Sequence, residues 1–492
     1  MTPTAAVAGK GALERYEAVI GIEIHCQLRT VSKMFCGCST EIDGAAPNSH
    51  CCPVCLGLPG VLPTINKSAV EHVIATGFAI QAAVAPTTRW DRKNYFYPDL
   101  PKGYQISQYQ LPLASNGRLT FDTSEGPFTV RINRAHLEED TGRLIHAEMG
   151  DRRVSLIDFN RSGMPLMEIV TEPDIRTAEQ ARRYAEELRL LMKTIGASDA
   201  EMENGQMRVE ANVSIRPIGR EEFGTRIEVK NMNSMRSVER AIAFEIERQA
   251  VAIDAGQTIR METRGWDEAR QSTYLMRPKE TENDYRYFPE PDLPPLVTSP
   301  EWLAEIKARL PELPAARRRR YETDLGLSSY DAGVIVNDAA ATALFEGALA
   351  AGPGLAAKQV ANWVTGEYLR LAKGADSGLV VASEVAILLK LVEDGMISGT
   401  NAKQVFAEHF ATGKGVSGIA KARGFEQISD AGALGKAIDE VLAANPGAVA
   451  DYRAGTAAAA GFLVGQVMKA TRGQANATMV QTALRERLDR AE

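Results

Sequence analysis

The chain has 492 residues, of which 45% are hydrophobic and 24% charged, and its formal net charge is −7. This composition is typical of a globular protein of two to four domains, and it excludes a disordered chain, a collagen-like repeat and a small disulfide-linked domain. No run of about 18 apolar residues predicts a membrane helix. Residues 1–14 lack the apolar core of a signal peptide. We therefore expect a disordered leader, residues 1–14, on a cytoplasmic protein.

The chain up to about residue 294 is rich in β-forming residues that alternate with polar ones. Five short stretches predict strands: residues 19–24, 128–133, 154–159, 207–215 and 226–229. Two amphipathic patterns, residues 178–195 and 237–255, predict helices that begin near Thr177 and Asn233. We expect an α+β domain with a large mixed or antiparallel sheet over residues 15–294.

Beyond a proline-rich stretch, residues 288–300, helix-forming residues dominate. Apolar residues at helical spacing predict helices over residues 380–394, 402–412 and 457–471. We expect an all-α domain over residues 295–408 and a small all-α tail domain over residues 409–492, with a joint at residues 413–418. The tail carries 10 Lys and Arg against 8 Asp and Glu, a net charge of +2. It is therefore the part of the chain least repelled by a phosphate backbone.

All six cysteines lie within residues 26–55. Cysteines clustered in this way in a cytosolic protein typically bind a metal ion. Four of them form two pairs with the spacings C-x-C and C-x₂-C: Cys36, Cys38, Cys52 and Cys55. Four thiolates satisfy a tetrahedral zinc ion and leave no open position for catalysis, so we expect structural zinc. The alternative is a set of reduced, partly buried thiols, and Cys51 can replace Cys52.

Acidic side chains recur within the β-patterned segments. Glu23 and His25 alternate along one predicted strand and share a face, as do Arg208 and Glu210 on a later one. Three consecutive acids, residues 138–140, need a neighbouring cation or arginines to offset their repulsion. Carboxylate oxygens are ligands that Mg²⁺ prefers. The alternative for each of these strands is a solvated polar face.

Basic, amide and aromatic side chains recur between these acids. The tyrosine-rich segment 93–104 is suited to stacking on a base or ribose, or it is a plain surface loop. Acids that hold Mg²⁺ and basic groups that contact phosphate are parts of a phosphoryl-transfer site. We expect eight residues to bind nucleotide or substrate: Lys93, Tyr95, Lys102, Asn160, Arg161, Arg208, Lys230 and Asn231. The chain has no P-loop, no dinucleotide-binding glycine motif and no hydrolase nucleophile elbow.

Seven segments together resemble the B subunits of the glutamyl/aspartyl-tRNA amidotransferases. They are residues 19–25, 52–63, 91–107, 136–142, 158–174, 228–240 and 284–293. The resemblance extends over nearly the whole chain and includes residues 461–469 and 473–476 of the tail. It implies a catalytic domain called the cradle, followed by a helical domain and a tail domain that engage tRNA.

The resemblance also implies an activity, partners and a site. It implies an ATP-dependent ligase that phosphorylates the Glu or Asp side chain misattached to tRNA(Gln) or tRNA(Asn), after which ammonia displaces the phosphate. A separate A subunit, a glutaminase, would supply the ammonia, and a small C subunit would complete the heterotrimer. The implied catalytic residues are Glu23, His25, Glu139, Glu168 and Glu210, the first four as Mg²⁺ ligands. The residues expected to contact tRNA are Lys469, Arg472, Gln474 and Asn476.

Three other functions match parts of the sequence. A non-catalytic tRNA-binding scaffold is disfavoured by the acidic motifs, because carboxylates repel phosphate unless a metal ion is present. An archaeal-type E subunit would carry an added synthetase-like domain, for which residues 340–420 leave no room. A zinc-ribbon RNA-binding protein would leave the acidic motifs without a role.

Overall fold

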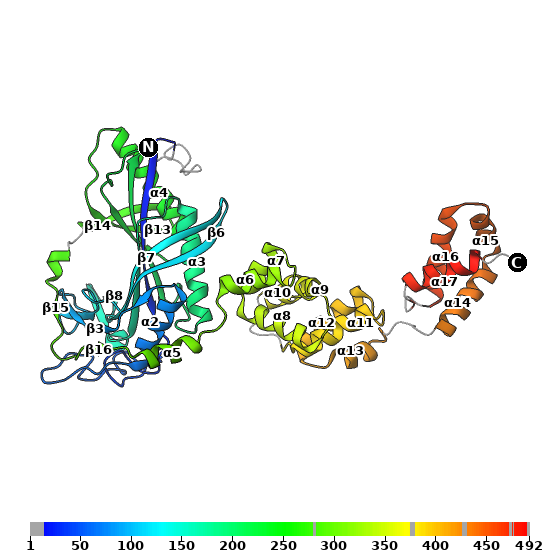
Figure 1. Ribbon diagram of the computed structural model, residues 1–492, viewed down its shortest axis with the longest axis horizontal. Coiled ribbons are helices and arrows are strands. Elements are labelled where there is room, and N and C mark those ends of the chain that lie inside the picture. Colours follow the sequence, from blue (N-terminus) through cyan, green and yellow to red (C-terminus); the bar gives the residue numbers. More distant parts are fainter. Residues whose placement is uncertain are drawn as a thin grey trace. The chain divides into compact units, whose positions relative to one another are not determined.

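The computed structural model describes residues 14–278, 282–373, 379–425, 431–471, 475 and 477–489. The chain forms two compact units, Met1–Pro314 and Ala315–Glu492. The first unit contains the described strands and the helices that pack on them, and the second is helical (Figure 1). The predicted α+β class, with a sheet domain followed by helical parts, is confirmed.

A twelve-stranded mixed sheet organises the first unit. Its strands in spatial order are β14 (Ser272–Pro278), β13 (Glu262–Asp267), β12 (Ile227–Met232), β11 (Met207–Pro217), β1 (Tyr16–Gln27), β10 (Pro165–Thr171), β7 (Gly126–Glu139), β5 (Tyr104–Ser107), β4 (Asp91–Asn94) and β15 (Phe288–Pro289). Off this path, β6 (Ala114–Thr123) pairs with β7, and β2 (Ala83–Val84) pairs with β6. β12 and β13 are parallel, whereas β1 pairs antiparallel with both β10 and β11.

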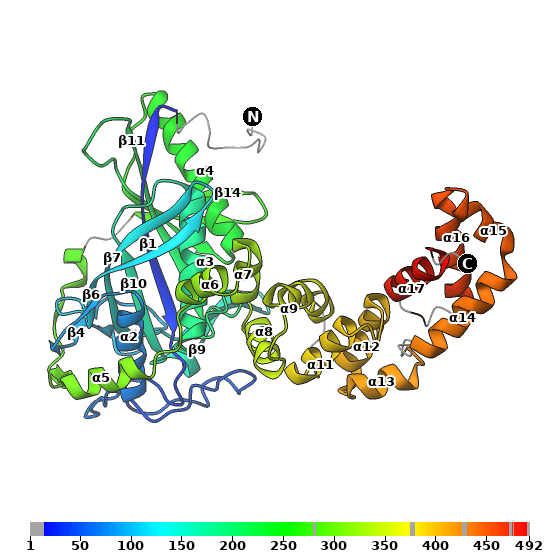
Figure 2. The ribbon, with the colours of Figure 1, turned by 45° about the vertical axis from the view of Figure 1, so that its right-hand side comes forward.

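The two faces of the sheet differ in polarity. Along β1, Ile20, Ile22 and Ile24 are buried in a hydrophobic core that includes residues of α3 (Ala178–Thr194) and α4 (Met235–Asp254). Both helices run along the sheet (Figure 2). The alternate residues Glu23 and His25 therefore lie on the face that these helices do not cover. This polar face carries the candidate site.

A β-bulge changes the direction of side chains partway along β7. Val130 and Ile132 are buried in the core, and beyond Asn133 the buried core residues are Ala135 and Leu137. In the pairing with β10, Val170 lies opposite Arg134, but the next residue, Thr171, lies opposite Ile132. Asn133 is therefore left without a partner residue on β10. The extra residue at Asn133 moves the core-facing side chains from even to odd positions.

The predicted strands all overlap observed ones, whereas the helix ends differ in detail. Thr177 caps α3 with a capping box, as its position predicts. The predicted cap of the second helix, Asn233, is wrong. The side chain of Ser234 accepts the Ser237 amide, so α4 begins at Met235.

The predicted domain boundary at residue 294 lies inside the first unit. Past the prolines, β16 (Leu296–Val297) pairs with β3 (Thr87–Thr88). α5 (Pro300–Ala308) then packs on α2 (Lys67–Ala79), where Trp302 Nε1 donates to Glu71 Oε1 at 2.9 Å. The prolines therefore mark an extended segment that stays with the sheet domain.

The second unit consists of α6 (Pro314–Thr323), α7 (Ser329–Val336), α8 (Ala339–Ala351), α9 (Ala357–Trp363), the π-helix η3 (Val364–Tyr368), α10 (Leu369–Ala372), α11 (Ala382–Glu393), α12 (Gly399–Thr412), α13 (Val416–Ala422), α14 (Ala431–Ala444), α15 (Pro446–Arg453), α16 (Ala457–Ala470) and α17 (Ala477–Asp489). α14, α16 and α17 share a core around Ile438, Leu463 and Leu484. α12 runs through the predicted boundary at 408/409, because the left-handed Gly413 ends it only after Thr412. The division into three domains stays a prediction.

Among the described residues, no single helix has the length and apolarity needed to cross a membrane. One pair, α7 and α8, reaches the threshold only when its members are taken together, and the two are bent by 113°.

Candidate functional site

Strand pairing brings an imidazole and several carboxylates together on the polar face of the sheet. In the register of β1 and β10, His25 lies opposite Glu168. His25 Nε2 lies 3.3 Å from Glu138 Oε1, 3.4 Å from Glu168 Oε2 and 3.6 Å from Glu23 Oε1. Glu138 and Glu168 are buried. We call Glu23, His25, Glu138 and Glu168 the acidic cluster.

The structure does not bring Glu139 to the acidic cluster. Its neighbour Glu138 stands there instead, because successive residues of a strand point to opposite faces. Glu139 is buried in an ion pair with Lys102, and the Ile106 amide donates to Glu139 Oε1 at 3.1 Å. Lys102, expected to bind nucleotide or substrate, is therefore also on the other side of β7.

Two further side chains of β7 reach the cluster. His136 lies opposite Glu168 in the register of β7 and β10. Its Nε2 is 3.9 Å from Glu168 Oε2, and Arg134 Nη2 is 3.3 Å from Glu168 Oε1. The sequence contains both residues in an alternating run with Glu138, a pattern that indicates a shared strand face once the bulge at Asn133 is known.

The electrostatics of the cluster favour a bound cation. Burial, followed by Glu168 and Glu210, raises the pKa of Glu23 to about 7. Burial opposes the charge of His25, but Glu138 and Glu168 outweigh it and hold the pKa of the imidazole well above its usual value. Crowded carboxylates therefore either retain a proton or share a positive charge.

Several ligand atoms in the cluster are positioned for a metal ion. Ligand atoms of Glu23, His25 and Glu168 lie within 4.8 Å of one another, as do those of His136, Glu138 and Glu168. Among the described residues, four buried atoms of this region have no hydrogen-bond partner: His25 Nδ1, Arg134 Nε, His136 Nδ1 and Glu138 Oε2. Buried polar atoms are normally paired. Oxygen-rich sets of this kind fit Mg²⁺.

Glu210 borders the cluster and is neutralised by a lysine. It lies directly opposite Glu23 in the register of β1 and β11. Lys230 Nζ is 2.6 Å from Glu210 Oε2 and 3.7 Å from Glu228 Oε1. Asn231 is not brought to the site, because its φ of +64° turns the exposed side chain toward the Tyr274 hydroxyl at 3.3 Å.

A second charged group forms around the buried carboxylate of Asp140. Arg208 donates to Asp140 Oδ1 at 3.2 Å, Gln27 Nε2 donates to Oδ2 at 3.1 Å, and Arg161 Nε is 3.6 Å from Oδ2. Burial opposes the charge of Asp140, but Arg208 and Arg161 outweigh it and lower the pKa of the carboxyl group. Two guanidinium groups share one carboxylate here, so the group has a net positive charge.

Asn160 is hydrogen-bonded to the backbone of the loop that precedes Cys51. Its Oδ1 accepts the His50 amide at 2.8 Å, and its Nδ2 donates to the Ala46 carbonyl at 2.8 Å. It is buried in η1 (Phe159–Arg161), next to Arg161. Its side chain therefore fastens the loop before Cys51 and is not directed at the acidic cluster.

Tyrosines stand beside Lys93 next to the cluster. Lys93 Nζ lies 5.0 Å from the ring centroid of Tyr285, a residue of η2 (Glu282–Tyr285), and Tyr95 meets the same ring edge-on at 6.1 Å. Burial opposes the charge of Lys93, but Glu138 outweighs it and raises its pKa well above the usual value. Tyr109 and Tyr287 stack at 4.2 Å. Residues 284–292 are rich in aromatic and charged side chains. Their spacing does not predict that β15, within this segment, pairs with β4.

A cleft of about 1290 Å³ lies beside the Asp140 group. Gln27, Arg161 and Met164 line it, together with the loop that carries Asp43 and the turn that carries Asn204. The cleft therefore gives solvent and ligands a route to Arg161.

The four predicted cysteines converge. The Sγ atoms of Cys36, Cys38, Cys52 and Cys55 lie within 4.8 Å of one another. In a tetrahedral zinc site with zinc–sulfur bonds of about 2.3 Å, the sulfur atoms lie about 3.8 Å apart. The four sulfur atoms would therefore have to move only slightly closer together to bind zinc. Cys36, with help from the Cys52 amide and Lys33, lowers the pKa of the Cys55 thiol. The donor set is compatible with a structural metal ion. Cys51 lies outside it.

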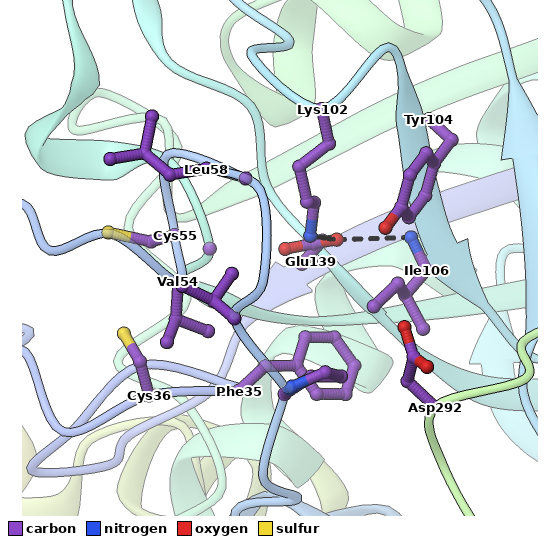
Figure 3. A pocket seen from close by; sticks show the side chains of 14 residues that line it. Phe35, Cys36, Val54, Cys55, Leu58, Lys102, Tyr104, Ile106, Glu139 and Asp292 are labelled. Carbon is purple, nitrogen blue, oxygen red and sulfur yellow. Dashed lines mark hydrogen bonds and ion pairs between the residues drawn. The ribbon is translucent and has the colours of Figure 1, made fainter.

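A small cavity of about 70 Å³ separates the cysteines from the Lys102–Glu139 pair. Figure 3 shows Lys102 and the Ile106 amide at the Glu139 carboxylate, with Cys36 and Cys55 across the pocket. The walls are formed by Phe35, Cys36, Val54, Cys55, Gly57, Leu58, Val61, Pro63, Lys102, Tyr104, Ile106, Glu139, Gly163 and Asp292.

Of the tail residues expected to contact tRNA, Lys469 is exposed near the end of α16. Arg472, Gln474 and Asn476 lie outside the described residues.

Comparison with known proteins assigns the family. A family model described as the GatB/GatE catalytic domain matches residues 18–304, and one described as the GatB domain matches residues 343–488. The B subunit of the aspartyl/glutamyl-tRNA(Asn/Gln) amidotransferase of Moorella thermoacetica is 51% identical over 477 residues, covering 96% of this chain and 100% of that protein. The proteins of the same name from Anaeromyxobacter sp. strain K and a Picosynechococcus species are 50% and 48% identical, each over 96% of this chain. The chain therefore belongs to the family of aspartyl/glutamyl-tRNA(Asn/Gln) amidotransferase B subunits.

Proposed function

We propose that the chain catalyses the ATP-dependent transamidation of Glu-tRNA(Gln), Asp-tRNA(Asn) or both. The observation that carries the proposal is the acidic cluster, in which His25 lies within 3.6 Å of Glu23, Glu138 and Glu168. A non-catalytic scaffold has no need of buried carboxylates beside unpaired imidazole atoms. The relatives are themselves named as amidotransferase subunits.

The reaction requires activation of a carboxylate. Ammonia does not displace oxide from a carboxylate, so the γ-phosphoryl group of ATP is first transferred to the side chain, which gives an acyl phosphate. Ammonia then attacks the acyl carbon and inorganic phosphate leaves. Bound Mg²⁺ would neutralise the charge that develops on the phosphate oxygens.

The residues of the chain divide this work. The acidic cluster (Glu23, His25, Glu138 and Glu168) would hold the Mg²⁺. His136, which lies beside Glu168, could supply a further ligand atom. We do not include Glu139, because Lys102 neutralises it on the other side of β7. Arg208 and Arg161 share one carboxylate and keep donors for phosphate or the substrate carboxylate. Lys93 and Tyr95 would bind the nucleotide at the other edge of the cluster.

We further propose structural zinc at Cys36, Cys38, Cys52 and Cys55. Elemental analysis of the purified chain would give about one zinc per molecule. Absence of zinc after metal-replete expression would contradict this.

The partners follow from the reaction. An A subunit that hydrolyses glutamine would supply ammonia, a C subunit would complete the complex, and tRNA(Gln) or tRNA(Asn) would carry the substrate. Residues 409–492, as a tail domain, would bind the tRNA. Aminoacylation takes place in the cytoplasm, so the complex would act there.

The decisive experiment measures transamidation with ammonium chloride, separately on Glu-tRNA(Gln) and Asp-tRNA(Asn). Free ammonium bypasses the glutaminase. His25→Ala and Glu168→Gln should each lower the rate by about 10²–10³, the cost of losing one charge-stabilising group. Asp122→Ala, an exposed acid on β6, is the matched control. Rates within a few-fold of the parent in both cluster variants would contradict the proposal.

A further inference from the structure

We propose that Lys33 is a positioning residue of the cysteine metal site: its buried ammonium donates to the Cys55 sulfur and joins the metal site to the turn that carries Arg161. The inference rests on the structural zinc proposed above. It assigns to a residue outside the four ligands the task of neutralising and orienting them.

The surroundings of Lys33 are unusual for a lysine. Only 1% of the residue is exposed. Its Nζ donates to the His50 carbonyl at 2.8 Å, to the Phe159 carbonyl at 3.4 Å and to Cys55 Sγ at 3.8 Å. An ammonium has three donors, and each has an acceptor here.

No described carboxylate forms an ion pair with Lys33. Lysine is almost never fully buried without a charged partner, because an ammonium loses its hydration there. The only anion that these contacts can supply is the thiolate of Cys55. Zinc with four thiolates carries a net charge of −2, so the buried ammonium offsets half of it. The buried ammonium therefore needs the thiolates as its counter-charge, and the metal-bound thiolates need the ammonium to offset their negative charge.

The same ammonium connects two segments that are far apart in sequence. His50 and Cys55 belong to the cysteine loop, whereas Phe159 begins η1. Two further hydrogen bonds join the same two segments. The Met34 amide donates to the Gly163 carbonyl at 2.8 Å, and Ser162 Oγ donates to the Cys55 carbonyl at 3.3 Å.

The position of Arg161 follows from these contacts. Arg161 is the last residue of η1, and its guanidinium reaches Asp140 and the Thr141 carbonyl. Lys33 thus fixes the carbonyl two residues before an arginine of the proposed phosphate-binding group.

The first test is zinc retention by the full-length chain. Lys33→Met keeps the aliphatic stem and removes the charge and donors. We expect zinc affinity to fall about 10–100-fold, the usual cost of removing a group that hydrogen-bonds a metal ligand. Competition with a chromogenic chelator at fixed pH measures this. Lys67→Met, whose side chain is 75% exposed on α2, is the matched control. Equal affinity in Lys33→Met and the parent would overturn the inference. Absence of zinc from the parent would overturn the zinc assignment as well.

A spectroscopic test separates a direct contact with sulfur from a general loss of stability. In the cobalt-substituted protein, a hydrogen bond to a thiolate stabilises the sulfur lone pairs and raises the energy of the sulfur-to-cobalt charge-transfer band. Lys33→Met should move this band to longer wavelength, while Lys33→Gln, which keeps a donor, should move it less. An unshifted band in both variants would contradict the contact.

The unmodified protein provides a test that does not depend on a variant folding. Acetylation with an amine-reactive reagent, followed by mass spectrometry, should leave Lys33 unlabelled and label Lys67 in the zinc-loaded chain. After chelation of zinc, labelling of Lys33 should rise. Labelling of Lys33 in the loaded chain, or continued protection after chelation, would overturn the inference.

Discussion

Glu138 and Glu139 are adjacent in sequence and lie in different surroundings. Glu138 is 3.3 Å from the His25 imidazole, and Glu139 is paired with Lys102 across the strand. The sequence indicated that this run of acids needs a neighbouring cation or arginines, but residue types alone do not distinguish two identical side chains.

The resemblance implied Glu139 as a metal ligand, and the bulge at Asn133 accounts for the position of Glu138, instead of Glu139, at the acidic cluster. Val130 and Ile132 are buried in the core, so strict alternation would direct Glu138 toward the core and Glu139 toward the polar face. The extra residue reverses this beyond Asn133. A bulge depends on the pairing with β10, which is distant in sequence, so no local pattern predicts it.

Glu138→Gln should weaken divalent-cation binding at least tenfold, because a neutral amide replaces a buried carboxylate ligand. Titration with Mn²⁺, with free Mn²⁺ counted by electron paramagnetic resonance, measures the affinity directly. Asp122→Asn serves as the control on the same sheet. Parental Mn²⁺ affinity in Glu138→Gln would remove this residue from the metal site.

At the scale of elements, a buried acid of α4, Glu245, adds a polar contact between the helix and the sheet. Glu245 accepts from Arg248 and from Gln249 Nε2, at 2.7 and 2.9 Å, and its Oε2 is 3.8 Å from Arg264 Nε on β13. Helical spacing predicted α4 correctly because its apolar stripe is regular. It did not predict this ion pair, since that depends on which strand lies beneath the helix.

Glu245→Ala should lower the free energy of unfolding by about 3–5 kcal/mol, because it leaves the partly buried Arg248 guanidinium without its carboxylate and removes the acceptor of the Thr273 hydroxyl. Urea unfolding monitored by circular dichroism measures the change. The control is Glu247→Ala on the same helix, where a partly exposed acid should change stability by under about 0.5 kcal/mol. Equal stability of the two variants would show that the buried pair contributes nothing.

At the scale of the whole molecule, composition predicted a sheet domain followed by helical parts. The two compact units divide after Pro314, beyond the predicted boundary at residue 294. Prolines occur both in linkers and in extended segments that pair with a sheet, and β16 is of the second kind. Glycine likewise marks both joints and helix ends, and Gly413 is a helix end.

All six cysteines belong to the unit Met1–Pro314. Removal of a structural metal ion takes its binding free energy from the unit that holds it. Chelation of zinc should therefore lower the melting temperature of this unit, expressed alone, and leave that of Ala315–Glu492 unchanged. Differential scanning calorimetry of the two units measures both. Restoring zinc should reverse the shift, and an equal shift in both units would contradict a single site among the cysteines.

Truncation after Ala422, the end of α13, removes α14–α17 without cutting a helix. It takes away residues 423–492, which include Lys469 and the other tail residues expected to contact tRNA. We expect tRNA affinity to fall about tenfold or more, equal to about 1.4 kcal/mol, while ATP hydrolysis on bound tRNA persists. Filter binding measures the affinity. Unchanged affinity would show that the tRNA site lies elsewhere.

The bulge at Asn133 restricts how the length of β7 can vary. The bulge is one extra residue, so deletion of Asn133 would remove it and leave a regular strand in which Ile132, Ala135 and Leu137 still face the core. Insertion of one further residue between Ile132 and His136 would instead exchange the faces of every side chain that follows, so the lysine-paired acid and the imidazole-paired acid would trade places. Surface loops tolerate insertions of any length, but this strand should tolerate added residues only in pairs. An insertion of one residue here in an aligned homologue would therefore mark a loss of this chemistry, unless a second bulge restores the phase.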